Sequence, residues 1–150
     1  MISRYERLLG VTTEISKLIS KISAIEMKRY GLRGSWARYL LLIKEHDGTV
    51  TAARLSTLSS RNKADVSRSL AELEEQGLVE RTSSAAYRAK LTLTPKGREI
   101  AEALYARASE IVEAASEGIG DEDRKILYAA LARLSKNLSE ISKSPTRGTE

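Results

Sequence analysis

The feature of this 150-residue chain that most constrains its fold is a close succession of four periodic segments between residues 51 and 94. Thr51 is a good N-cap for a short helix, TAARLSTL, and the polar stretch SSRN follows it. A second helical pattern runs over 62–76, and Gly77 is placed to end it as a C-cap glycine. LVERT and AKLTLT then alternate apolar and polar residues. The sequence therefore predicts two short helices joined by a polar turn and followed by a two-stranded hairpin.

Longer helical patterns flank this middle segment. Apolar residues recur at steps of three and four over roughly 3–29, which indicates a long amphipathic helix. A helix over roughly 35–46 follows, and one face of it carries the candidate core residues Trp36, Tyr39, Leu40 and Ile43. Pro95 begins another helix, which is interrupted at 118–120 before a last helix that Asp121 caps. We expect a mainly α fold with a small β-hairpin.

The last helix has apolar residues at heptad spacing. They follow steps of 4-3-4-3 and are Leu127, Leu131, Leu134, Leu138 and Ile141. Long helices at both ends carry more apolar surface than one lobe can cover, which favours a twofold homodimer. The alternative is that this seam packs within one chain, against helix 3–29 or helix 96–117. The tail 144–150 has no pattern and is expected to be disordered.

Composition excludes several kinds of chemistry. The chain has no cysteine and a single histidine, His46, which rules out disulfides, thiolate metal sites and His-clustered zinc sites. It has no phosphate-cradling glycine loop and no carboxylate pair with a matched histidine, so we expect neither an enzyme nor a cofactor. No apolar run approaches the ~18–20 residues that span a bilayer, and the N-terminus lacks the apolar stretch of a signal peptide. The expected location is the cytoplasm.

The distribution of charge is more informative than the formal net charge of +5. Eight Lys and Arg residues lie in the segment 51–97, against five acids. Four of these acids fall between positions 72 and 80, so basic groups dominate around 54–68. A basic surface favours polyanionic partners such as nucleic acid.

The helix over 62–76 has the form of a DNA-reading helix. The major groove of DNA admits one α-helix, and a second helix braces it across the backbone. If Val66, Leu70 and Leu73 point inward, the opposite face presents another set of residues. These are Ala64, Asp65, Arg68, Ala71 and Glu72, flanked by Lys63 and Ser67. The alternative interpretation is an ordinary amphipathic surface helix of mixed charge.

Each residue of that face has a chemical role open to it. Arg68 can bond to guanine O6 and N7, Ser67 to a base edge or a phosphate, and Ala64 can touch a thymine methyl. Asp65 fits less easily: it can accept a hydrogen bond from cytosine N4, cap the helix, or orient Arg68 as an i, i+3 pair.

Phosphate contacts are expected at the start of the same helix, where backbone amides are free. The candidate side chains are Ser59, Ser60 and Arg61.

Residues 49–97 resemble the MarR (multiple antibiotic resistance regulator) family. The support helix of that family begins Leu-Thr-x-x-x-Leu-(Ala/Ser), and residues 50–56 correspond to it. Its recognition helix reads Asp-Lys-Ser-x-Val-(Thr/Ser)-Arg-x-Leu-x-x-Leu-Glu, and Asn62-Lys63-Ala64-Asp65-Val66-Ser67-Arg68 starts the matching stretch here. The Gly-Leu-(Ile/Val)-x-Arg and Leu-Thr-x-x-Gly motifs of the family appear as 77–81 and 93–97.

The resemblance implies a winged helix-turn-helix regulator of transcription. It implies an N-terminal dimerisation helix over 1–34, a DNA-binding lobe over 35–97 and C-terminal dimerisation helices over 98–143. Such a homodimer reads a pseudo-palindromic operator in double-stranded DNA, here as a repressor. The alternative is a winged-helix module that binds DNA without sequence choice or binds protein.

The wing departs from the family pattern. The family usually has Asp-Arg-Arg there, whereas residues 84–88 have no acid and one arginine. Arg88 is our candidate for a minor-groove contact, with Lys90 as the second choice.

The resemblance also implies a crevice for a small phenolic or aromatic acid between the dimerisation helices and the DNA-binding lobe. Tyr5, Trp36 and Tyr39 would stack on such a ligand, and Arg38 would pair with its carboxylate. The alternative for Trp36 and Tyr39 is a place in the core.

Overall fold

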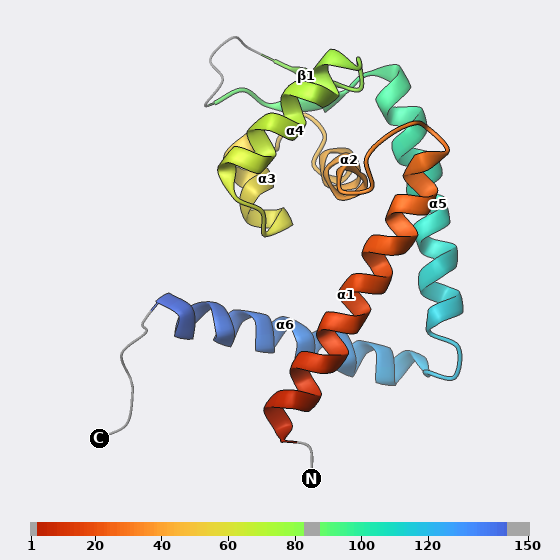
Figure 1. The fold of residues 1–150 in the computed structure, drawn as a ribbon, viewed down its shortest axis with the longest axis vertical. Coiled ribbons are helices and arrows are strands. Elements are labelled where there is room, and N and C mark those ends of the chain that lie inside the picture. The colour runs from red at the N-terminus through yellow and green to blue at the C-terminus, as the bar shows by residue number, and fades with distance from the viewer. Residues whose placement is uncertain (1–2, 83–87, 144–150) are drawn as a thin grey trace. The chain divides into compact units, whose positions relative to one another are not determined.

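The computed structural model describes residues 3–82 and 88–143. They form eight elements, coloured in chain order in Figure 1. These are α1 (Arg4–Lys28), α2 (Trp36–Glu45), α3 (Ala52–Ser59), α4 (Lys63–Glu75), β1 (Val79–Arg81), β2 (Leu91–Leu93), α5 (Pro95–Ala115) and α6 (Asp121–Lys143). The prediction of a mainly α chain with one small hairpin is confirmed.

The chain divides within α5 into two compact units, residues 1–109 and 110–150. The sequence-based division at 34/35 and 97/98 concerns the roles of the parts and stays a prediction. The expected disorder of the tail 144–150 falls outside the described residues.

Side-chain caps start α3 and α4 where the sequence indicates. Thr51 Oγ1 accepts a hydrogen bond from Arg54 N at 3.2 Å, and Asn62 Oδ1 accepts one from Asp65 N at 2.8 Å. Each satisfies an amide that has no partner inside its helix. At the far end of α4, Gly77 has a φ of +69°, a conformation that costs glycine little. The predicted N-cap at Thr51 and the predicted C-terminal glycine are confirmed.

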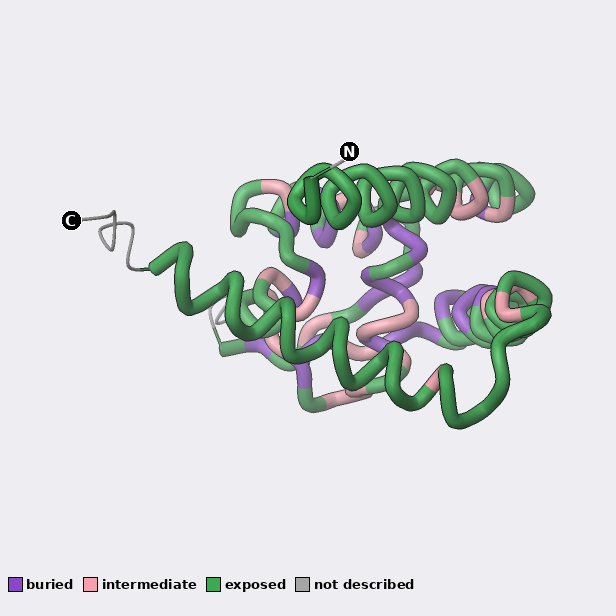
Figure 2. The backbone as a smooth tube through the Cα atoms, turned by 90° about the horizontal axis from the view of Figure 1, so that it is seen from below, coloured by how far each residue is buried: buried purple, intermediate pink, exposed green. Residues whose placement is uncertain are grey.

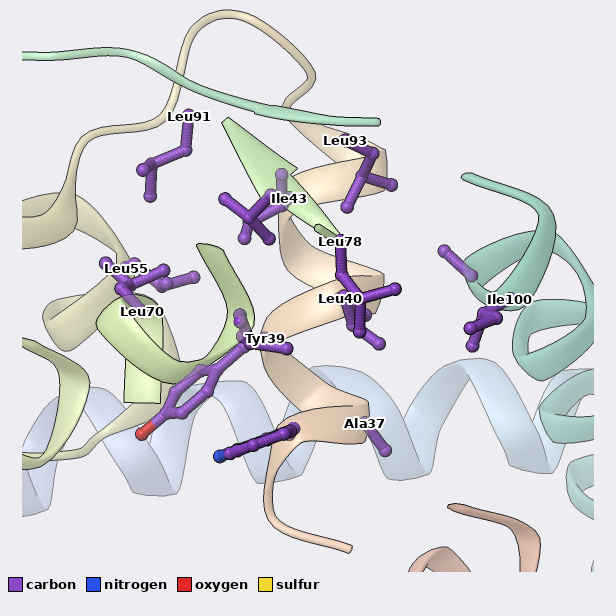
Figure 3. Close-up of a cluster of buried hydrophobic side chains, with 14 of the residues drawn as sticks. Ala37, Tyr39, Leu40, Ile43, Leu55, Leu70, Leu78, Leu91, Leu93 and Ile100 are labelled. Atoms are coloured by element: carbon purple, nitrogen blue, oxygen red, sulfur yellow. The ribbon is translucent and has the colours of Figure 1, made fainter. Parts of the chain in front are cut away.

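The core of the first unit is built around α2 (Figure 3). Trp36, Tyr39, Leu40 and Ile43 are all buried, as predicted for this face. Val66, Leu70 and Leu73 of α4 close the core from one side, and Leu78, Leu91 and Leu93 close it from the hairpin. The helix-turn-helix is therefore fixed to α2 through its apolar face.

The hairpin joins the helix-turn-helix to α5. β1 and β2 pair antiparallel, with Val79 opposite Leu93. Just after β2, the buried Thr94 hydroxyl donates a hydrogen bond to Gly77 O at 2.6 Å and accepts one from Gly97 N at 3.0 Å. A Cβ at Gly97 would lie 2.0 Å from Leu78 O, so only glycine allows this close approach. The Thr94 hydroxyl thus fixes the end of α4 to the start of α5.

The second unit contains the end of α5 and all of α6. Arg124 joins these two helices, because its NH1 lies 3.1 Å from Glu113 Oε1 and its Nε donates to Ile119 O at 3.1 Å. None of the residues of α6 is buried in the single chain (Figure 2). The five predicted seam residues are all exposed, between 39% for Leu134 and 65% for Ile141.

Among residues 3–82 and 88–143, no helix has both the length and the apolar character needed to cross a membrane.

Candidate nucleic-acid interface

Helix α4 turns its apolar side inward and a polar side outward. Val66, Ser69, Leu70 and Leu73 are buried, as the periodicity predicts. The outward side consists of exposed residues, namely Lys63, Ala64, Ser67, Arg68, Ala71 and, in the last turn, Glu75. In the described part of the chain, no acidic side chain pairs with Arg68 or Lys63. The side that would meet a DNA groove is therefore uncharged or positive along most of its length.

The turn between α3 and α4 is fixed by its own backbone and one serine. Ser60 has a φ of 56°, the left-handed conformation that ends α3. Ser56 holds Arg61, the residue after Ser60, through two hydrogen bonds. The Ser56 hydroxyl donates to Arg61 O at 2.6 Å, and the Ser56 carbonyl accepts from Arg61 N at 3.2 Å. The side chains of Ser60 and Arg61 are exposed beside the start of α4.

Ser59 does not fit the predicted phosphate contact. It is only 3% exposed, and its hydroxyl donates to Ser56 O at 3.4 Å within α3. Four residues earlier, Leu55 is buried on the same side of the helix. Ser59 is therefore a core-facing residue, and the interface proposed below omits it.

Two acids that the sequence placed on the face opposite the buried one lie instead against the α2 side. The Tyr39 hydroxyl donates to Asp65 Oδ2 at 3.0 Å, and Arg33 NH2 pairs with Glu72 Oε2 at 3.1 Å. Both carboxylates belong to half-buried residues. The expected roles of Asp65, contact to cytosine or orientation of Arg68, do not match this geometry.

A third carboxylate of α4 is held on the other flank. Glu74 Oε1 lies 2.6 Å from Arg81 Nε on β1. Asp65, Glu72 and Glu74 therefore all point to neighbouring elements, while the cations of α4 remain exposed. This arrangement reduces the repulsion that carboxylates would exert on phosphates near the same helix.

Burial raises the pKa of Tyr39, and the hydrogen bond and negative charge of Asp65 raise it further, while the charge of Arg61 and a hydrogen bond with Ser69 oppose the shift. Tyr39 is consequently protonated at neutral pH and is the donor of this bond.

The described part of the hairpin carries two exposed cations, of which Lys90 lies beside the helix-turn-helix. Lys90 is exposed, its Nζ lies 3.4 Å from Thr49 O, and its backbone forms a bridge with Thr51 at the start of α3. Arg88 is also exposed. The remainder of the predicted wing, residues 83–87, lies outside the described residues, so the minor-groove contact stays a prediction.

The four predicted ligand-binding residues do not form one site within a chain. Trp36 and Tyr39 are core residues, 2% and 1% exposed. Arg38 is used structurally, because its NH2 donates to Leu58 O at 3.0 Å. Tyr5 is 72% exposed at the opposite end of α1. Gly34, just before α2, packs against Ala24 of α1, so this end of α1 is the one near Trp36. Tyr5 lies 19 residues before Ala24, which is about 28 Å along the helix.

Arg33 is a residue that sequence reasoning missed. Its guanidinium lies 5.4 Å from the centroid of the Trp36 ring and also pairs with Glu72 of α4. Its position two residues after a glycine in a turn carries no signal of either contact. The described residues contain no group of three or more His, Asp or Glu side chains that could hold a metal ion.

Comparisons with known proteins agree with this geometry. The sequence model of the MarR family matches residues 30–88, which contain α2, α3, α4 and β1. An uncharacterised HTH-type transcriptional regulator of Bacillus subtilis, YybA, is 26% identical over 126 residues, 83% of each chain.

Two solved structures extend the agreement to the whole fold. A putative MarR family regulator from Listeria monocytogenes, solved with a 26mer DNA, has a TM-score of 0.82 at 22% identity and covers 100% of this chain and 98% of its own. A MarR protein of Staphylococcus aureus, solved with salicylate and kanamycin, has a TM-score of 0.76 at 19% identity and covers 91% and 93%.

Proposed function

Since this chain belongs to the MarR family of winged helix-turn-helix transcription regulators, we propose that it represses transcription as a homodimer that reads a pseudo-palindromic DNA site through α4. The observation that carries the proposal is the composition of the outward side of α4. Arg68, Ser67 and Ala64 are exposed there, and three of the acids of α4, Asp65, Glu72 and Glu74, are held against other elements.

The contacts divide by chemistry into base and phosphate contacts. Arg68 bonds bidentately to a guanine, Ser67 reaches a base edge or a phosphate, and Ala64 packs on a thymine methyl. Arg61, Ser60 and Lys63 bind phosphates at the start of α4, together with the first amides of the helix. Arg88 and Lys90 contact the backbone or the adjacent minor groove.

The exposed apolar residues of α6 support the homodimer. Leu127, Leu131, Leu134, Leu138 and Ile141 follow a heptad along a helix with no buried residue. Such a seam is stable in water when a second helix covers it, and a twofold axis supplies an identical one. The twofold axis would also place two copies of α4 about one DNA turn apart, roughly 34–36 Å, which matches a pseudo-palindrome.

The proposal includes regulation by a small aromatic acid. The salicylate complex of the Staphylococcus aureus protein suggests the class of ligand. In this chain, the Trp36 Nε1 is buried without a hydrogen-bond partner in the described structure, so it is an unused donor that a ligand oxygen would satisfy. The ligand would shift the DNA-bound population only by its differential affinity for the two states.

The test is selection of a random duplex library by the purified protein at near-physiological salt, repeated with Arg68→Ala. Arg29→Ala is the matched control, because Arg29 is an exposed cation at the end of α1. We expect wild type and control to enrich the same pseudo-palindrome, and Arg68→Ala to lose discrimination at one base pair per half-site by roughly 1–3 kcal/mol. Binding without enrichment would refute sequence-specific reading.

A further inference from the structure

Asp65 carries a negative charge at a position where a DNA-binding helix would be expected to have none. It lies in the first turn of α4, three residues after the N-cap Asn62 and three before Arg68. DNA phosphates approach this end of the helix, because its free amides and dipole favour anions. A carboxylate that swung outward here would repel those phosphates.

The hydroxyl of Tyr39 keeps the carboxylate on the α2 side. The O–H···Oδ2 distance between the two oxygens is 3.0 Å, and Tyr39 is only 1% exposed. Figure 3 shows the Tyr39 ring extending from α2 with its oxygen at the far end, away from Ala37 and Ile100. The ring is packed in the core, so the hydroxyl is a fixed donor rather than a mobile one.

Arg33 holds the same flank of α4 at a second point. Glu72 follows Asp65 by seven residues, about two turns, so both acids lie on one side of the helix. Arg33 NH2 is 3.1 Å from Glu72 Oε2, and the Arg33 guanidinium also lies over Trp36. The contacts on the α2 side thus restrain the rotation of α4. Among the described residues, Tyr39 is the side chain that hydrogen-bonds to the Asp65 carboxylate.

A cation competes for Asp65 if that partner is lost. Arg61 lies close enough to the Tyr39 hydroxyl to lower its pKa. An unheld Asp65 carboxylate could turn toward Arg61, which is a candidate phosphate contact, and neutralise it. Repulsion of phosphate and neutralisation of Arg61 would both weaken DNA binding.

We propose that Tyr39 is a positioning residue for DNA binding, which acts by holding the Asp65 carboxylate away from the phosphates that approach α4. The inference rests on the proposed function, since it concerns the same surface. Tyr39 touches no DNA; its effect passes through Asp65. It follows that Tyr39 matters for affinity only while position 65 carries a negative charge.

The test is a double-mutant cycle of Tyr39→Phe and Asp65→Asn, with Tyr30→Phe as the matched control at an exposed tyrosine. Affinity is measured for the selected duplex and for a random duplex at several salt concentrations, and thermal unfolding is measured for each variant. We expect Tyr39→Phe to weaken both complexes by roughly five- to fiftyfold, the size of one new like-charge contact at a partly screened surface. In the Asp65→Asn background, the same change should alter affinity by less than about twofold.

Salt dependence separates this role from a merely structural one. The defect of Tyr39→Phe should shrink as salt increases, because the repulsion is electrostatic. An equal loss of affinity in both backgrounds, or a loss that does not change with salt, would overturn the inference and leave the proposed function standing. A wild-type protein that binds no duplex would overturn the proposed function and this inference with it.

Discussion

Replacement of Thr94 by valine tests the connection between the DNA-reading helix and α5. Valine keeps the size of the side chain and removes the hydroxyl, which donates to Gly77 O at 2.6 Å and accepts from Gly97 N at 3.0 Å. Thr94 is 9% exposed, and the Gly97 N–H bond is buried. The substitution therefore breaks two hydrogen bonds and leaves the Gly97 amide without its partner.

The expected cost follows from those two bonds. Each contributes roughly 0.5–1.5 kcal/mol net, and a buried group left unpaired adds about 1–3 kcal/mol. Water can reach the Gly77 carbonyl, because Gly77 is exposed, so the second penalty applies only to Gly97. We expect Thr94→Val to lower the free energy of unfolding by about 2–6 kcal/mol. For a chain of this length, that corresponds to a fall in Tm of roughly 4–24 °C.

The assay is thermal and urea unfolding at one fixed protomer concentration, since dimerisation makes Tm depend on concentration. Thr92→Val is the matched control: Thr92 lies on the same strand, β2, but is only half-buried. The control should change stability by less than about 0.5 kcal/mol. A Thr94→Val protein as stable as the Thr92→Val protein would refute the idea that this hydroxyl fixes the end of α4 to α5.

Two further predictions concern assembly and pH. Leu134→Glu, in the exposed seam of α6, should shift the protein from dimer to monomer in sedimentation equilibrium, because a charge in a paired apolar seam is desolvated without a partner. Lys125→Glu on the same helix is the control, and a Leu134→Glu protein that stays dimeric would place the interface elsewhere. The raised pKa of Tyr39 means that the folded state holds this proton more tightly than the unfolded state, so its stabilising contribution is present below the unfolded value near 10 and is lost as pH rises through the folded value. As pH rises above about 10, the wild type should therefore lose more stability than Tyr39→Phe in urea titrations, and parallel losses would contradict this assignment.

Local signals in the sequence were sufficient for the elements and for the inward side of α4. Thr51 and Gly77 mark helix ends because capping depends on neighbours three to five residues away. The burial of Val66, Leu70 and Leu73 follows from helical spacing alone. The same reasoning, applied to α3, would have placed Ser59 inward, since it follows buried Leu55 by one turn.

The partners of the acids on α4 could not be predicted in this way. Tyr39 and Asp65 are 26 residues apart, and Arg33 and Glu72 are 39 apart. Their contacts depend on how α4 crosses α2, and helical periodicity gives the buried side of each helix without the crossing angle. Asp65 lies beside the buried stripe, where a small rotation of α4 decides between exposure to DNA and contact with α2. A helical wheel that divides residues only into inside and outside misplaces such a residue.

The contacts of these flanking acids explain why α4 carries acidic residues as well as exposed cations. The helix needs exposed cations to meet phosphate, and it also has to be held in a fixed orientation on its lobe. Apolar packing by Val66, Leu70 and Leu73 fixes its depth, but the directional contacts come from Asp65 and Glu72 on one flank and Glu74 on the other. Because each of these acids is paired inside the lobe, the orientation of Arg68 is restrained without leaving those carboxylates on the outward side. Substitutions that neutralise them should consequently alter which base pair Arg68 reaches more than they alter the net attraction to DNA.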